Sequence, residues 1–233
     1  MKCELHLTLM SDATFGRGDG VAGLVDAEVE HDAYGLPFIR GRTLKGILVE
    51  ECANVLYALQ QAACPKTLAQ CAAAARLLFG QPGSTGADNA LLRVGAALLP
   101  RALREAIRDE IDLAHLTPDD VLASLTAIRR QTAVNEATHA PEQNSLRSLR
   151  VVLRNTTFIA ELEIAPELES QGPQALLAAT ILALRRAGTG RNRGRGRLQA
   201  KLYDEQDQEV TTAWFAYLTE MLHTEATTQG PVV

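Results

Sequence analysis

Glycines and arginines alternate in one short segment of this sequence, Gly188-Thr-Gly-Arg-Asn-Arg-Gly-Arg-Gly196. Glycine lets main-chain amides approach a ligand closely, and guanidinium groups form paired hydrogen bonds with phosphate oxygens. The segment is therefore suited to binding an oxyanion, with phosphate as the natural ligand. The alternative is that the arginines only solvate a turn and favour the negative end of the helix before it.

The segment matches neither of the two common glycine-rich phosphate motifs. A dinucleotide fingerprint lies between a strand and a helix, whereas this segment is expected between a helix and a strand, with Arg193 where the third glycine belongs. A P-loop would end in Gly-Lys-Ser or Gly-Lys-Thr. Both motifs are therefore excluded.

The charges around this segment favour contact with RNA. No aspartate or glutamate occurs between Gln171 and Tyr203, although the whole chain has a formal net charge of −5. Such an acid-free cationic segment can meet a polyanion while the remaining surface stays soluble. Only 4% of the residues are aromatic, so base stacking should contribute little. The arginines expected to contact phosphate here are Arg185, Arg186, Arg191, Arg193, Arg195 and Arg197.

Residues 35–46 form a second candidate anion site, with the sequence Gly-Leu-Pro-Phe-Ile-Arg-Gly-Arg-Thr-Leu-Lys-Gly. A turn leads here into a predicted helix with Thr43 as its N-cap. Free amides and the positive end of the helix dipole attract anions, and Arg40, Arg42 and Lys45 flank this helix start. A capped, exposed helix start without a ligand would look similar.

The spacing of apolar residues predicts the elements that position these two segments. Alternation predicts strands at 3–9, 25–29, 91–99, 158–164 and 198–202, and helical spacing predicts helices at about 44–59, 68–79, 100–111, 117–128, 172–187 and 211–224. In the strand at 25–29, Asp26 and Glu28 are expected on the polar side. No period is sustained over 129–144, which indicates a long loop or a protruding hairpin. This order of elements predicts an α+β fold with a ferredoxin-like core and insertions.

The composition excludes two classes of protein. No apolar run approaches the length of a membrane span, so we expect neither a membrane protein nor a secreted precursor. The four cysteines lack any Cys-x-x-Cys pair, so reduced thiols in a cytoplasmic protein are expected rather than a zinc site.

These motifs resemble those of the repeat-associated mysterious protein (RAMP) superfamily, specifically the backbone subunits of type III CRISPR effector complexes. The resemblance rests on Gly23-Leu-Val-Asp26, on the motif at 35–46, which is its most specific part, and on the glycine-rich loop at 188–196. Thr132-Ala-Val134 and Ser145-Leu-Arg-Ser-Leu149 resemble the middle insertion of the family, called the thumb.

The resemblance implies one RAMP domain over residues 1–233. Its RNA-recognition-like core would comprise about 3–63, 90–99 and 147–203, with a helical insertion at about 64–128, a thumb at about 129–147 and a C-terminal helix at about 211–224. Such a subunit binds a guide RNA (crRNA), single-stranded target RNA and the other subunits of the complex.

The resemblance also implies a catalytic residue. The catalytic aspartate of the family falls on Asp26, which would hold Mg²⁺ or another divalent metal near a scissile phosphate, with Asp19 as a second candidate ligand. Two alternatives stay open: a scaffold subunit that binds the same RNA without cutting it, and a stand-alone guide-processing endoribonuclease that uses His6 and no metal. In this chain Arg40-Gly41-Arg42 replaces the usual Pro-Gly-Ser of the motif.

Overall fold

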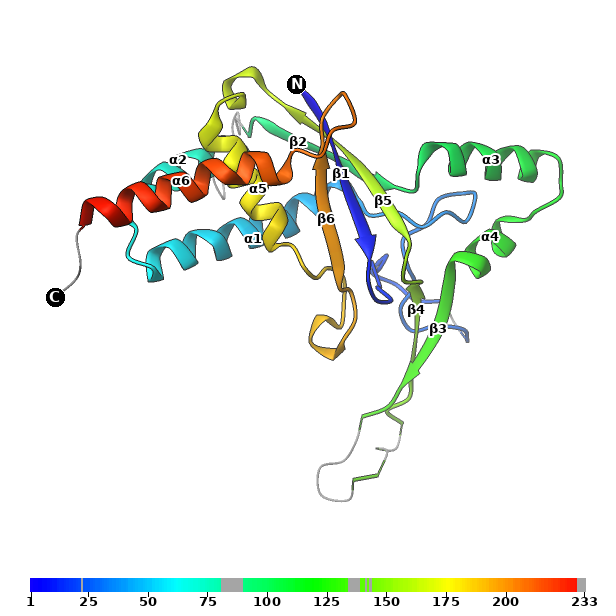
Figure 1. Cartoon of the computed structure of the whole chain (residues 1–233). Helices are drawn as coiled ribbons and strands as arrows, with labels where there is room; N and C mark the ends of the chain where they lie inside the picture. The colour runs from blue at the N-terminus through cyan, green and yellow to red at the C-terminus, as the bar shows by residue number, and fades with distance from the viewer. Residues whose placement is uncertain (22, 81–89, 134–138, 141, 143, 230–233) are drawn as a thin grey trace.

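A four-stranded antiparallel sheet forms the centre of the molecule. The computed structural model describes all residues except 22, 81–89, 134–138, 141, 143 and 230–233 (Figure 1). The strands β1 (Lys2–Leu9), β2 (Leu92–Leu98), β5 (Thr157–Ile164) and β6 (Leu198–Tyr203) pair in the order β2-β5-β1-β6. The predicted alternation is confirmed in β1, where Cys3, Leu5, Leu7 and Leu9 are buried.

Helices cover one side of this sheet. They are α1 (Gly41–Gln61), α2 (Pro65–Phe79), α5 (Gln171–Ala183) and α6 (Thr211–Gln229), and α5 packs against α1, α2 and α6 (Figure 1). Helix α5 is apolar on nearly every face, so it lies in the core with Leu176, Ala178 and Ile181 inaccessible to solvent. Trp214 of α6 packs half-buried against the same core.

Six of these elements, β1, α1, β2, β5, α5 and β6, follow one another as strand, helix, strand, strand, helix, strand, and the first and third of these strands lie at the middle of the sheet. This order and the antiparallel register confirm the predicted α+β fold with a ferredoxin-like core.

A long arm leaves the core between β2 and β5. Helices α3 (Arg101–Asp112) and α4 (Pro118–Leu125) lead into a two-stranded hairpin of β3 (Thr126–Gln131) and β4 (Arg147–Val152), which extends away from the sheet (Figure 1). We call residues 126–152 the arm. Two short 3₁₀ turns, Pro166–Leu168 and Arg191–Arg193, complete the structure.

The prediction that the helix at 117–128 reaches Ile128 is wrong. Thr126 is extended (φ −135°, ψ 166°), and its hydroxyl donates to the carbonyl of Leu122. Because Thr126 and Ile128 are β-branched, they favour the strand that starts here. The arm therefore begins earlier than the predicted hairpin.

The predicted strand at 25–29 is also wrong. These residues form only isolated bridges, including Ala27 with Leu149 of β4 and Val29 with Gly16. Of its expected polar side, only Asp26 is exposed, since Glu28 and Glu30 are 2% and 9% exposed. Alternation alone was misleading because Glu28 and Glu30 are buried in ion pairs with Arg150 and Arg40.

The sheet is acidic at the end of β6. A hollow of about 360 Å³ lies beside the N-terminal end of β1, and carboxylates dominate its lining: Glu4, Glu161, Asp204, Glu205 and Asp207, with Lys2. All four cysteines carry free thiols, as expected. Among the described residues, none of the helices has the length and apolarity that crossing a membrane requires.

Candidate nucleic-acid interface

The glycine–arginine segment forms a tight loop between α5 and β6. Gly188 and Gly196 have φ of +86° and +69°, and a Cβ atom at Gly196 would lie 1.9 Å from the carbonyl oxygen of Ala187. A bridge between Arg186 and Arg197 closes the loop. Glycine is therefore required at Gly196 for both its backbone angle and its close contact.

Residues 12–14 connect this loop to the arm. The amides of Thr189 and Gly196 donate to the carbonyls of Thr14 and Asp12, at 3.0 and 2.9 Å. Ala13 pairs on its other side with Val152 of β4 through both backbone hydrogen bonds. Residues 12–14 therefore hold the loop and the arm together through backbone hydrogen bonds.

The 35–46 motif places the start of α1 against the sheet. Helix α1 starts at Gly41, where a Cβ atom would lie 2.4 Å from the carbonyl oxygen of Val94 in β2. Arg40 occupies the N-cap position without a side-chain cap, so the prediction of Thr43 as N-cap is wrong. The helix begins three residues earlier than predicted, because only glycine allows this approach to β2.

The structure brings the two predicted basic segments together. One hollow of about 450 Å³ is lined by Arg40 and Thr43 from the motif and by Gly188 and Arg191 from the loop. A second hollow of about 820 Å³ continues along the loop and shares Glu50 and Arg191 with the first. An ion pair of 3.2 Å joins Arg191 of the loop to Glu50 of α1, the helix that starts within the 35–46 motif.

The predicted RNA-binding cations differ in their partners. Arg40 pairs with Glu30 at 2.8 Å, and this carboxylate raises the pKa of the Arg40 guanidinium. Arg195 donates to Gln131 at the end of β3. The remaining predicted cations form no ion pair with any described residue: Arg42, Lys45, Arg185, Arg186, Arg193 and Arg197.

Asp26 lies in the same hollow as Arg40 and Arg191. Its backbone amide donates to the carbonyl of Ser148 at 2.7 Å, and its carboxylate accepts the amide of Ser148 at 2.6 Å. The residue is exposed, and one carboxylate oxygen has no hydrogen bond to a described residue. Asp26 is thus fixed against β4 while it stays open to a ligand.

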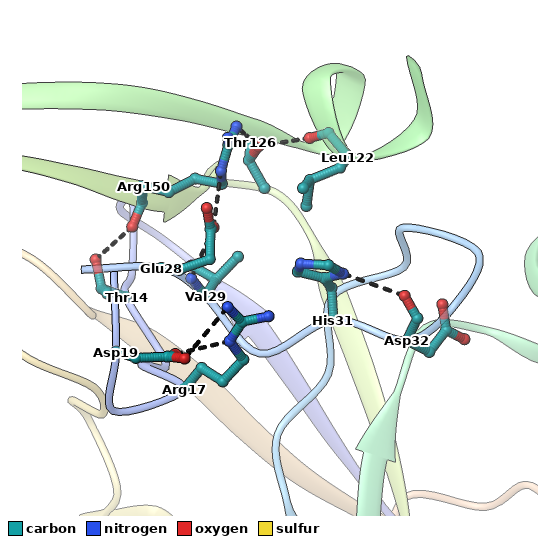
Figure 2. A network of polar contacts seen from close by, with 10 residues as sticks. All are labelled: Thr14, Arg17, Asp19, Glu28, Val29, His31, Asp32, Leu122, Thr126 and Arg150. Carbon is teal, nitrogen blue, oxygen red and sulfur yellow. Dashed lines mark hydrogen bonds and ion pairs between the residues drawn. The ribbon is translucent and has the colours of Figure 1, made fainter. Parts of the chain in front are cut away.

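Asp19 faces the same hollow but is already neutralised. Its carboxylate accepts from Nε of Arg17 at 2.7 Å, and this hydrogen bond lowers the pKa of the Asp19 carboxyl (Figure 2). The described residues contain no group of three or more acidic, histidine or cysteine side chains that could enclose a metal ion. Mg²⁺ often uses one carboxylate together with water and substrate phosphates, so Asp26 fits this ion and Asp19 in its present pairing does not.

His6 lies elsewhere, on the open face of the sheet. Its Nε2 atom is 3.0 Å from a carboxylate oxygen of Glu4, and its ring lies 4.3 Å from that of Tyr203. It lines none of the hollows that hold the basic segments. His6 is therefore separate from the hollows that the two basic segments line, and the exposed Lys201 lies opposite it on β6.

Further functional candidates lie along the arm. A hollow of about 710 Å³ is lined by Arg147 of β4 and Arg193 of the loop, with Gln131 and Ser145. Glu28 pairs with Arg150 of β4 at 2.8 Å. Sequence reasoning missed this pair because no local spacing connects two residues so far apart, although three alternating acids at 26–30 marked one side of it. Val134 of the predicted thumb motif lies outside the described residues.

The RAMP superfamily model matches residues 6–199. The chain belongs to the RAMP superfamily. This RAMP chain is similar in fold to a chain in a cryo-EM structure of the type III-B Cmr-beta complex bound to cognate target RNA, with a TM-score of 0.59, 14% identity and coverage of 87% of this chain and 97% of that chain.

A chain in the apo Cmr-beta structure has a TM-score of 0.57 and 13% identity, with coverage of 88% of this chain and 98% of that one. No curated protein matches the sequence. The shared architecture therefore extends over most of both chains.

Proposed function

We propose that this RAMP chain is a guide-RNA-binding backbone subunit of a type III CRISPR ribonucleoprotein. The observation that carries the proposal is the hollow where the motif at 35–46, the loop at 188–196 and Asp26 meet. The similarity in fold to Cmr-beta chains, one of them in a complex with target RNA, supports the same assignment. Partners of the chain would be a crRNA, a target strand and neighbouring subunits.

The unpaired cations would hold the guide through its phosphates. Arg42, Lys45 and Arg193 lie on the two segments that border the connected hollows, and no described acid neutralises them. Contacts of this kind read the shape of the backbone and not the bases, as a subunit that accepts any guide requires. The arm would lie next to the guide RNA, since Arg147 of the arm and Arg193 of the loop line one hollow.

We further propose that Asp26 takes part in cutting the target RNA. Mg²⁺, when bound, stabilises negative charge at the scissile phosphate. Asp26 would hold this ion through its free carboxylate oxygen, while the amide of Ser148 fixes the other oxygen at 2.6 Å. A splayed ribose presents its own 2′-hydroxyl: the 2′-O–P bond forms, the P–O5′ bond breaks, and the proton lost from the 2′-oxygen is balanced by one gained at the 5′-oxygen.

Replacement of Asp26 tests cleavage separately from assembly. In the purified complex, Asp26→Ala should abolish cutting of a labelled target while the guide and the other subunits still co-purify. Glu163→Gln, on the open face of the sheet, serves as a matched loss of one exposed carboxylate. Cleavage that survives Asp26→Ala, or that persists in EDTA, would contradict the assignment.

One observation favours the non-cleaving scaffold as a second candidate. Asp26 is the single carboxylate in its hollow whose side chain forms no ion pair within the described residues. A scaffold would bring the same length of nuclease-protected RNA through purification yet leave a bound target intact with Mg²⁺ present. Cleavage of the target by the wild-type complex, lost in Asp26→Ala, would reject this candidate.

A further inference from the structure

A buried ion pair includes Glu28, two residues after Asp26 in the chain. Glu28 is 2% exposed, and one of its carboxylate oxygens lies 2.8 Å from Nε of Arg150, whose side chain is 12% exposed (Figure 2). The same oxygen of Glu28 accepts the amide of Val29 at 2.9 Å. Burial removes water from both charges, so loss of either partner leaves the other uncompensated.

The arginine of this pair reaches several segments at once. Its Nη1 atom donates to the hydroxyl of Thr126, which in turn donates to the carbonyl of Leu122 at the end of α4 (Figure 2). Its own carbonyl accepts the hydroxyl of Thr14, which is 1% exposed. One side chain and its backbone thus connect both strands of the arm to residues 12–14.

Residues 26–28 run beside β4 like an extra parallel strand. Asp26 exchanges hydrogen bonds with Ser148, and the amide of Arg150 donates to the carbonyl of Ala27 at 3.0 Å. The spacing of two residues between Asp26 and Glu28 matches the two residues between Ser148 and Arg150. The ion pair therefore fixes the register in which Asp26 meets Ser148.

We propose that Glu28 and Arg150 are positioning residues that hold the Asp26 carboxylate in a fixed place against β4 of the arm. The inference rests on the proposed function for its catalytic meaning, but the positioning itself is a property of the free protein. Glu28 and Arg150 act through Asp26 and Ser148, and neither needs to touch the RNA.

Hydrogen exchange on the full-length protein tests the positioning without RNA. In Glu28→Gln, exchange of the amides in 147–152 should become faster by about tenfold or more, because the segment that protects them loses its buried anchor. Glu225→Gln is the matched control: this buried carboxylate accepts the amides of Lys66 and Thr67 at the start of α2, away from the arm. Unchanged exchange in Glu28→Gln, or equal acceleration in Glu225→Gln, would overturn the proposal.

A double-variant cycle separates a shared role from two independent ones. Arg150→Gln should accelerate the same amides, and Glu28→Gln with Arg150→Gln should be no worse than the more damaged single variant. Additive effects would show that the two residues act separately and would refute the proposal that they act as a pair. If Glu28→Gln does not fold, Arg150→Lys keeps the charge but loses the guanidinium geometry, and it should still accelerate exchange in 147–152.

Cleavage kinetics provide the functional arm of the test. Glu28→Gln in the assembled complex should lower kcat for target cleavage by about tenfold or more with guide affinity unchanged within about twofold, as expected for a displaced catalytic group. Full kcat in this variant would overturn the proposal. If the wild-type complex does not cut RNA, the cleavage proposal fails and hydrogen exchange alone decides the positioning role.

Discussion

The carboxylate of Asp26 differs from the acids around it because it is not neutralised by an arginine. Asp19, Glu28, Glu30 and Glu50 each pair with a different arginine, whereas Asp26 is held by a backbone amide. A hydrogen bond from a neutral amide orients a carboxylate but does not balance its negative charge, as an arginine would. Under the proposed function, a metal ion would therefore bind at Asp26 in preference to the paired acids of this hollow.

Asp19 should accordingly matter much less than Asp26. The hydrogen bond from Arg17 lowers the pKa of Asp19, so this carboxyl stays ionised and paired as the pH falls through the ordinary aspartate range. Because exposed pairs contribute little, we expect Asp19→Asn to change cleavage by less than about threefold. Single-turnover cleavage by this variant beside Asp26→Asn is the measurement, and an equal loss in both would show that Asp19 is also a ligand.

The cysteines provide a check on the packing of single side chains. Burial raises the pKa of Cys3 and of Cys71 to about 11, and burial also raises the pKa of Cys52. Since the thiolate is the reactive form, roughly one in 1,000 thiols with a pKa of about 11 is ionised at pH 8. Only the half-buried Cys64 should therefore react quickly with a thiol reagent in the native protein.

Peptide mass spectrometry after brief labelling identifies the modified cysteine. Labelling in denaturant should modify all four, which controls for reagent and detection. Fast native labelling of Cys71 would show that the contact between α1 and α2 is more open than the structure has it.

The glycine–arginine loop depends on two glycines in different ways. Gly194 and Gly196 both have positive φ, but a Cβ atom meets nothing within 4 Å at Gly194 and lies 1.9 Å from the Ala187 oxygen at Gly196. Gly194→Ala should lower stability by about 1 kcal/mol through backbone strain alone. Gly196→Ala adds a steric clash and should cost at least about twice as much, with weaker guide binding.

Thermal unfolding and guide affinity of the two variants distinguish these effects. Gly194→Ala is the control for positive φ, so the difference between the variants reports the contact with Ala187. Equal melting temperatures would contradict the closed form of the loop.

Sequence reasoning succeeded where a local pattern determines the structure and failed where distant packing does. The alternation of Leu5, Leu7 and Leu9 gave β1 correctly, because one buried face suffices to specify it. The strand expected at 25–29 failed because Glu28 finds Arg150, a partner that no local pattern indicates. The start of α1 moved to Gly41 for the same kind of reason, since β2 lies against it.

Only part of the candidate site could likewise be predicted from the sequence. Its two basic segments and Asp26 could be selected from glycine and arginine spacing and from the resemblance at 35–46. The carboxylates that form ion pairs with Arg40 and Arg191 could not be predicted, because each comes from a different part of the chain. Because these two arginines are paired, the cations left without an ion pair within the described residues include Arg42, Lys45 and Arg193.

Guide binding by the whole molecule should weaken as salt increases. With four arginine–phosphate contacts, the slope of log affinity against log salt should be about −3, from roughly 0.7 per contact to a single strand. Arg193→Gln should make this slope shallower by about 0.7. Filter binding of a guide at several salt concentrations measures both values, and a salt-independent affinity would argue against phosphate contacts.

Strand β6 separates two regions of opposite charge. Its first residue follows the arginine-rich loop, and its last precedes the turn with Asp204, Glu205 and Asp207, at the other end of the sheet (Figure 1). A polyanion in solution therefore attracts one pole of the molecule and repels the other before any contact forms. Under the proposed function, the arginine-rich loop would face the RNA before contact, so a larger share of encounters would lead to binding.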